Sequence, residues 1–182
     1  MTSGILMSGN EIIIAPRGII SRIREIRVHN ESKIAAVPGD IVTVLLSTKE
    51  HIDRGDVIIN ADSTRHLVKK MTAQIVLLRN NPLRCITQDS MRYEASFFFH
   101  TCQVTCKITK LISTVDKKTA NIITEAPRTL RKLECALVVI EPTQPLFIDT
   151  FAMNTLPGKL GRFGFSDSKI LCGAGIVKSV DE

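Results

Sequence analysis

Short apolar runs rich in β-branched residues and separated by turn residues are the dominant pattern of this chain. The clearest runs are residues 12–14, 41–46, 57–59, 73–78, 93–99 and 137–140. Runs this short, bounded by Gly, Pro, Asn or Asp, predict strands rather than helices. Residues 19–28 combine isoleucines at helical spacing with an alternating end, so the pattern alone leaves helix and strand open there.

A long alternating stretch follows in the second half of the chain. Between residues 104 and 113 the even-numbered positions, from Val104 to Ile112, are expected on one face of a strand and the odd-numbered positions on the other. Residues 116–119 read as a hairpin tip because extended segments flank them. Many short strands at regular spacing indicate a sandwich or closed barrels.

A polar stretch interrupts the apolar runs at residues 60–66. We place a domain junction there, which divides the chain into residues 1–66 and residues 67–182. No segment has the periodicity of an amphipathic helix of ordinary length.

Composition narrows the class of protein. The 182 residues are 44% hydrophobic and 23% charged, as expected for a globular chain with a buried core. The net charge of +6 fits either a nucleic acid or acidic partner or simply a solvated basic surface. An odd number of cysteines, five, favours reduced thiols. With no apolar run long enough to span a membrane, these features predict a cytoplasmic protein without membrane contact.

The chain has no phosphate-binding loop. No Gly-x-x-x-x-Gly-Lys-Ser/Thr motif and no Gly-x-Gly-x-x-Gly after a strand occur, so we do not expect nucleotide hydrolysis by this chain alone. We assign it no catalytic residue, no cofactor and no metal site of its own.

His100, Cys102 and Cys106 form a cluster that suggests two kinds of site. A zinc site does not fit, because strand geometry puts the two cysteines about 13 Å apart. A thiol nucleophile made of His100 and Cys102, about 6.6 Å apart along the strand, is a remote alternative. Burial of the cysteines as small hydrophobes is the expected outcome.

Five cations near the hairpin tip form a candidate RNA-contacting stretch, with a solvated hairpin as the default interpretation. They are Lys117, Lys118, Arg128, Arg131 and Lys132. A free-standing RNA-binding barrel is therefore a second remote alternative. The aromatic run at residues 97–99 is expected to alternate between two faces, so core burial is favoured over a stacking platform.

An ordered set of motifs in the first domain resembles the second domain of the elongation-factor-like translational GTPases. Its members are Gly9-Asn10-Glu11, Val28-His29-Asn30-Glu31, Pro38-Gly39-Asp40 and Arg54-Gly55-Asp56. The resemblance implies a β-barrel whose N-terminal strands lie upstream of this chain. It also implies that residues 19–28 form a strand with a bulge at Glu25.

The second domain most resembles the third domain of the eukaryotic class II peptide chain release factor. The matching segments are His100-Thr101-Cys102, Asp116-Lys117-Lys118-Thr119 and Leu160-Gly161-Arg162-Phe163. The implied fold is all-β, with two closed antiparallel barrels in tandem and the first truncated at its N-terminus. The first barrel would contact the ribosomal small subunit and an upstream GTPase domain that holds GTP and Mg.

By the same resemblance the second barrel would dock the stop-codon-reading release factor and support GTP-dependent peptide release. The expected partner-binding residues are His100, Gly161, Arg162, Phe163, Phe165 and Asp167. Ser166 stands where the release factors usually carry Arg, which leaves the partner open. The alternatives are the ribosome-rescue GTPase that pairs with a Pelota-like protein and elongation factor one-alpha, which binds aminoacyl-tRNA. Weak contact with rRNA or tRNA fits any of the three.

Overall fold

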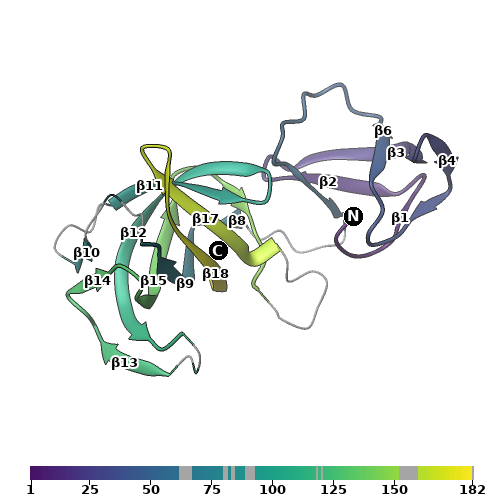
Figure 1. The fold of residues 1–182 in the computed structure, drawn as a ribbon. Helices are drawn as coiled ribbons and strands as arrows, with labels where there is room; N and C mark the ends of the chain where they lie inside the picture. Colours follow the sequence, from purple (N-terminus) through teal and green to yellow (C-terminus); the bar gives the residue numbers. More distant parts are fainter. Residues whose placement is uncertain are drawn as a thin grey trace.

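The computed structural model describes residues 1–61, 67–79, 82, 85–88, 93–117, 119, 121–151 and 160–181. Within these residues every regular element that extends over several positions is a strand, and the pairings fall into two sets that share no strand (Figure 1). The all-β, tandem-barrel prediction is thus confirmed. The predicted boundary at residue 66 falls among residues 62–66, outside the described residues, and stays a prediction.

The first unit, residues 1–61, combines a separate two-stranded sheet with a curled five-stranded antiparallel sheet. Its strands are β1 (Leu6–Met7), β2 (Glu11–Ala15), β3 (Ile19–Val28), β4 (Glu31–Lys33), β5 (Ala35–Ala36), β6 (Val42–Leu46) and β7 (Val57–Asn60). β3 is the centre of this sheet, since it pairs with β2, β4 and β6. Its buried side chains, chiefly isoleucines of β2 and β3, form a small core of their own.

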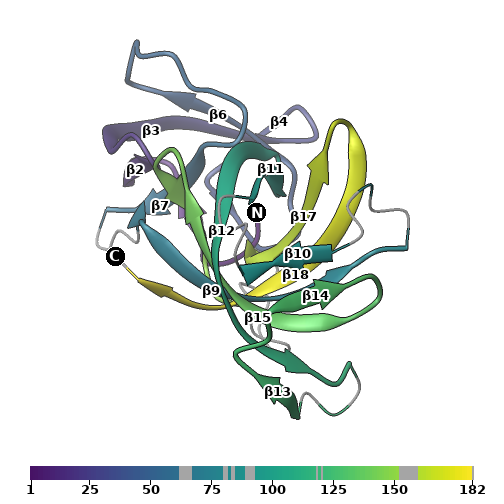
Figure 2. The same cartoon turned by 90° about the vertical axis from the view of Figure 1, so that its left-hand side faces the viewer.

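The second unit, residues 67–181, contains a closed barrel. Its strands are β8 (Leu67–Val68), β9 (Lys70–Leu77), β10 (Cys85–Thr87), β11 (Tyr93–Phe99), β12 (Cys102–Val115), β13 (Ile122–Glu125), β14 (Thr129–Arg131), β15 (Cys135–Pro142), β16 (Leu146–Phe147), β17 (Arg162–Asp167) and β18 (Ile170–Asp181). The ring runs β11–β17–β18–β9–β15–β12 and closes through the β11–β12 pair. β13 continues beyond β12 as an arm outside the ring (Figure 2).

β3 is a strand, as the family resemblance implied. Its register against β6 shifts between Ile23 and Glu25, so the expected bulge at Glu25 is confirmed. The bulge lets one long strand pair with β2 at its start and with β4 and β6 at its end, which curls the sheet.

β12 departs from the alternation expected for residues 104–113. Val104, Cys106 and Ile108 are buried as predicted, but Leu111 and Ser113 then take the buried face. The register against β15 shifts between Ile108 and Lys110, and again before Ser113. A bulge adds one residue and so exchanges the faces, and strict alternation was therefore wrong beyond residue 109.

Four phenylalanines on β11 and β17 fill the barrel at one side. Phe97 lies between Phe99 and Phe165, with ring centroids 6.1 and 5.1 Å away, and Phe163 lies 5.5 Å from Phe97. Phe98 is the exposed member of the aromatic run, so the predicted alternation at residues 97–99 is confirmed. Some of these ring pairs are stacked and others are tilted, and they stabilise the interior by both burial and ring contact.

Two glycines of β18 make room for these rings. Gly173 pairs with Phe165 and Gly175 with Phe163 across the β17–β18 hairpin. A Cβ at Gly173 would lie 2.4 Å from Cζ of Phe165, and one at Gly175 would lie 2.6 Å from Cζ of Phe163. Only glycine therefore fits at both positions while the rings keep their places.

The two units touch through a turn of the first. Gly55 has a φ of +108°, and a Cβ there would lie 2.9 Å from Cα of Cys102 at the start of β12. Beside it, Arg17 binds the carboxylates of Asp53 and Asp56, which ties the turn to the end of β2. The turn thus meets the second unit backbone to backbone, between the two lobes of Figure 1.

We predict that Gly173→Ala will lower the free energy of unfolding of the chain by about 1–3 kcal/mol, because the added methyl group overpacks the ring of Phe165. Gly164→Ala is the matched control: it lies on the same hairpin, and its Cβ would meet Leu171 Cδ1 at an ordinary 3.5 Å. Chemical denaturation of both variants measures the difference. Equal stability of the two variants would contradict the proposed fit.

We also predict that Gly55→Ala will separate the two units in solution, since its Cβ cannot fit against Cys102. Gly39→Ala controls for backbone strain, because Gly39 has a similar φ of +102° and no atom within 4 Å of its Cβ position. Small-angle scattering should show a larger radius of gyration for Gly55→Ala alone. Identical scattering from both variants would show that this contact does not hold the units together.

Candidate functional site at the Gly161–Arg162 corner

Gly161 lies where the chain turns into β17, packed against an irregular segment after β16. A Cβ at Gly161 would lie 2.4 Å from the backbone nitrogen of Phe151 and 2.8 Å from the carbonyl oxygen of Asp149. The backbone can approach this closely only because residue 161 lacks a side chain. Gly161 therefore fixes the segment at residues 149–151 beside the first residue of β17.

Arg162 uses this approach to stack on an aromatic ring. Its Cζ lies 4.8 Å from the ring centroid of Phe151, within the range of a cation–π contact. The Phe151 N–H donates a hydrogen bond of 2.8 Å to the carbonyl of Val177, which anchors the ring from β18. Arg162 is exposed and forms no ion pair with any residue that the structure describes.

His100 joins the corner from the turn between β11 and β12. Its φ of +53° places it in the left-handed region, and its side chain lies near the backbone of Leu160, next to Gly161. Burial lowers the pKa of His100 below its ordinary value, while the interaction with the Leu160 backbone acts in the opposite direction. The structure thus brings together three of the residues expected to bind a partner: His100, Gly161 and Arg162.

The other three expected residues lie elsewhere. Phe163 and Phe165 are 5% and 0% exposed and belong to the barrel core, so they can support the corner but offer no surface. Asp167 ends β17, five residues and about 16 Å along the strand from Arg162. There it accepts a hydrogen bond from Ser168 Oγ. The pKa of Tyr93 is raised chiefly by burial, then by Cys172, and to a smaller extent by Asp167.

Phe151 is the residue of the corner that sequence reasoning missed. It stands alone in an irregular segment, outside any apolar run and any motif. The only signal was an aromatic residue separated from the apolar run at residues 146–148 by Asp149 and Thr150, which does not distinguish a stacking ring from an ordinary half-buried side chain.

The cysteine cluster does not have the features of a nucleophile site. Cys106 is fully buried, and burial raises its pKa to about 12. Burial also raises the pKa of Cys102, with a smaller contribution from the charge of Asp56. An activated thiol needs the opposite shift, so the thiol-hydrolase alternative loses its physical basis.

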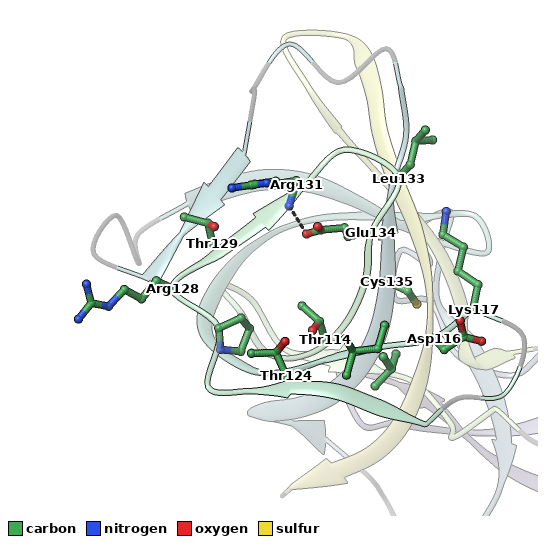
Figure 3. Close-up of a pocket in the computed structure, with 13 residues that line it drawn as sticks. Thr114, Asp116, Lys117, Thr124, Arg128, Thr129, Arg131, Leu133, Glu134 and Cys135 are labelled. Atoms are coloured by element: carbon green, nitrogen blue, oxygen red, sulfur yellow. Dashed lines mark hydrogen bonds between the residues drawn. The ribbon is translucent and has the colours of Figure 1, made fainter.

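The basic stretch is gathered around a separate hollow of about 730 Å³ between β13, the β14–β15 turn and the end of β12 (Figure 3). Lys117, Arg128 and Arg131 line it, together with Ile123 and Leu133. Lys132 is exposed but does not line the hollow, and Lys118 lies outside the described residues.

Metal-ligating clusters and membrane-spanning helices are both missing from the described part of the chain. Across residues 1–61, 67–79 and the other described segments, no three His, Cys, Asp or Glu side chains gather as metal ligands do. Nor does any helix there have the length and apolar character needed to cross a bilayer.

Comparison with known proteins identifies the family. The family described as GTP-eEF1A C-terminal domain-like matches residues 70–178. Elongation factor 1-alpha of Methanocaldococcus jannaschii is 32% identical over 98% of the chain, and that of Archaeoglobus fulgidus is 32% identical over 96%. The chain spans 40% of the length of each of these relatives.

Solved structures agree on the fold. The structure of sup35 complexed with GDP matches the whole chain with a TM-score of 0.88 at 19% identity. The match takes in 43% of the sup35 chain. Elongation factor SelB from Methanococcus maripaludis in its apo form matches 98% of the chain, with a TM-score of 0.71 at 16% identity. That match takes in 38% of the SelB chain. The chain therefore belongs to the GTP-eEF1A C-terminal domain-like family and contains β-barrel domains of a translational GTPase.

Proposed function

We propose that this chain is the partner-binding part of a translation termination GTPase. The second barrel would hold the stop-codon-reading release factor at the Gly161–Arg162 corner. A GTPase domain carrying GTP and Mg would act with it on the ribosome in the cytosol to support peptide release.

The observation that carries this proposal is the stacked, solvent-facing Arg162. A guanidinium offers a planar fork of donors, and its stacking on Phe151 holds that fork in place before any partner arrives. Preorganised Arg beside an aromatic ring is typical of the few residues that dominate protein–protein affinity. The motifs His100-Thr101-Cys102 and residues 116–119 favour the release-factor branch of the family.

A second candidate function is the binding of aminoacyl-tRNA. It is favoured by the sequence relatives, several of which are elongation factors 1-alpha at about 30% identity. The same corner would then contact the flat, anionic surface of a tRNA, which an Arg also recognises well. A Pelota-like protein is the third partner to be tested.

We predict that Arg162→Ala will weaken binding of the release factor by roughly 10–100-fold, the effect of removing an interface hot spot. Arg162→Lys should give an intermediate loss, because Lys keeps the charge but not the planar fork. Isothermal titration of the chain with purified release factor measures both.

Lys132→Ala is the control, since it also removes one exposed cation but lies away from the corner. Parallel titrations with a Pelota-like protein and with aminoacyl-tRNA separate the candidates. Tight binding of one of these instead, with the same sensitivity to Arg162→Ala, would replace the release factor as partner. An unchanged affinity in Arg162→Ala for every partner would remove the corner as a docking site.

A further inference from the structure

The hollow beside β13 is lined by both apolar and cationic groups. Ile123 and Leu133 are 67% and 44% exposed, although they are large hydrophobic side chains. Val115 and Pro127 add further apolar lining. Exposed side chains of this size that border one hollow mark a binding surface more often than a solvated face.

The charges around the hollow are unbalanced. Lys117, Arg128 and Arg131 form no ion pair with any described residue. The two acidic side chains that line the hollow already accept hydrogen bonds. Glu134 accepts one from the backbone N–H of Arg131 at 2.8 Å, and Asp116 accepts one from the backbone N–H of Thr119 at 2.8 Å. Figure 3 shows the carboxylate of Glu134 turned toward Arg131, with Arg128 extending outward at the rim. The hollow therefore offers positive charge to a ligand.

β13 also has a free edge. It is the last strand in the order of its sheet and pairs only with β12 among the described strands. Thr124 pairs with Thr114, and the N–H of Ala126 donates to the carbonyl of Ile112. Because hydrogen-bonding positions alternate in an antiparallel pair, the backbone groups of Glu125, which lies between Thr124 and Ala126, face away from β12. Ile123 lies at a register shift of this pair, where the alternation is interrupted. An added strand would find its hydrogen-bonding partners there.

We propose that this hollow and the edge of β13 bind an extended protein segment in which acidic and apolar residues alternate. The segment would add to β13 as a strand, with apolar side chains against Ile123 and Leu133 and carboxylates near Arg128, Arg131 and Lys117. Backbone bonds supply affinity in this mode and the alternate side chains supply specificity. A nucleic acid would use the cations but neither the free backbone edge nor the apolar lining.

This surface is distinct from the Gly161–Arg162 corner. β12 begins two residues after His100 and ends at Val115, which lines the hollow. The two surfaces thus lie near opposite ends of the longest strand in the barrel, and a protein partner at the corner leaves the hollow free for a second segment.

The test uses amide chemical shifts of the isotope-labelled chain. The probe is a short capped peptide that alternates aspartate with isoleucine, and its lysine counterpart and a short oligouridylate serve as comparisons. We expect the acidic peptide alone to shift amides of residues 112–135 and to leave those near Arg162 unchanged. Shifts caused by the oligouridylate but not by the acidic peptide would overturn the proposal, as would equal binding of the lysine peptide.

Two variants probe the two halves of the mechanism. Reversing Arg128 and Arg131 to Glu should weaken binding of the peptide about tenfold, whereas Lys132→Glu, outside the hollow, should change it less than about twofold. Glu125→Pro removes an outward-facing N–H without touching the bonds to β12, and should abolish the shifts. Unaltered binding in either the charge-reversed or the proline variant would overturn the proposal, with unperturbed amides of β9 and β18 showing that the barrel is folded.

Discussion

The closed ring of the second unit depends on one steric fit, that of two phenylalanine rings over two glycines. β17 and β18 pair so that Phe163 faces Gly175 and Phe165 faces Gly173. The space above each glycine is filled by the ring of its partner, and the rings in turn pack on Phe97 and Phe99 of β11. β17 can then join β11 to β18, and the β11–β12 pair completes the ring. Without room above β18, the aromatic side chains could not lie inside a barrel of this size.

Phenylalanine rings occupy the interior of this barrel at one side, and the two proposed binding surfaces lie at strand ends and turns. The corner is formed where β17 begins and the β11–β12 turn meets it, and the hollow is formed where β12 ends and its hairpin arm leaves the ring. Small barrels of this kind gain function through their loops while their cores stay packed.

The sequence was most informative where local pattern decides the structure. Apolar runs located most strands, the alternation of Phe97, Phe98 and Phe99 was correct, and the family resemblance identified β3 as a bulged strand. It was least informative where distant segments meet. The bulges of β12 exchange its faces because β15 pairs with it out of register, and no local pattern contains that pairing. Phe163 and Phe165 belong to the same motif as Arg162, yet strand alternation around the buried core turns them inward. Phe151 reaches Arg162 only because Gly161 lets the two backbones approach.

The corner and the contact between the units share one turn of the chain. Gly55 of the first unit lies against the backbone of Cys102, two residues after His100, and His100 lies near the backbone of Leu160, which precedes Gly161. The contact at Gly55 is between two backbones, so it does not adapt easily through side-chain rotation. The corner that carries Arg162 therefore lies beside the β11–β12 turn, which also contacts the first unit. In the arrangement proposed above, a partner docked at Arg162 would lie beside the β11–β12 turn, the part of the ring that also contacts Gly55 of the first unit.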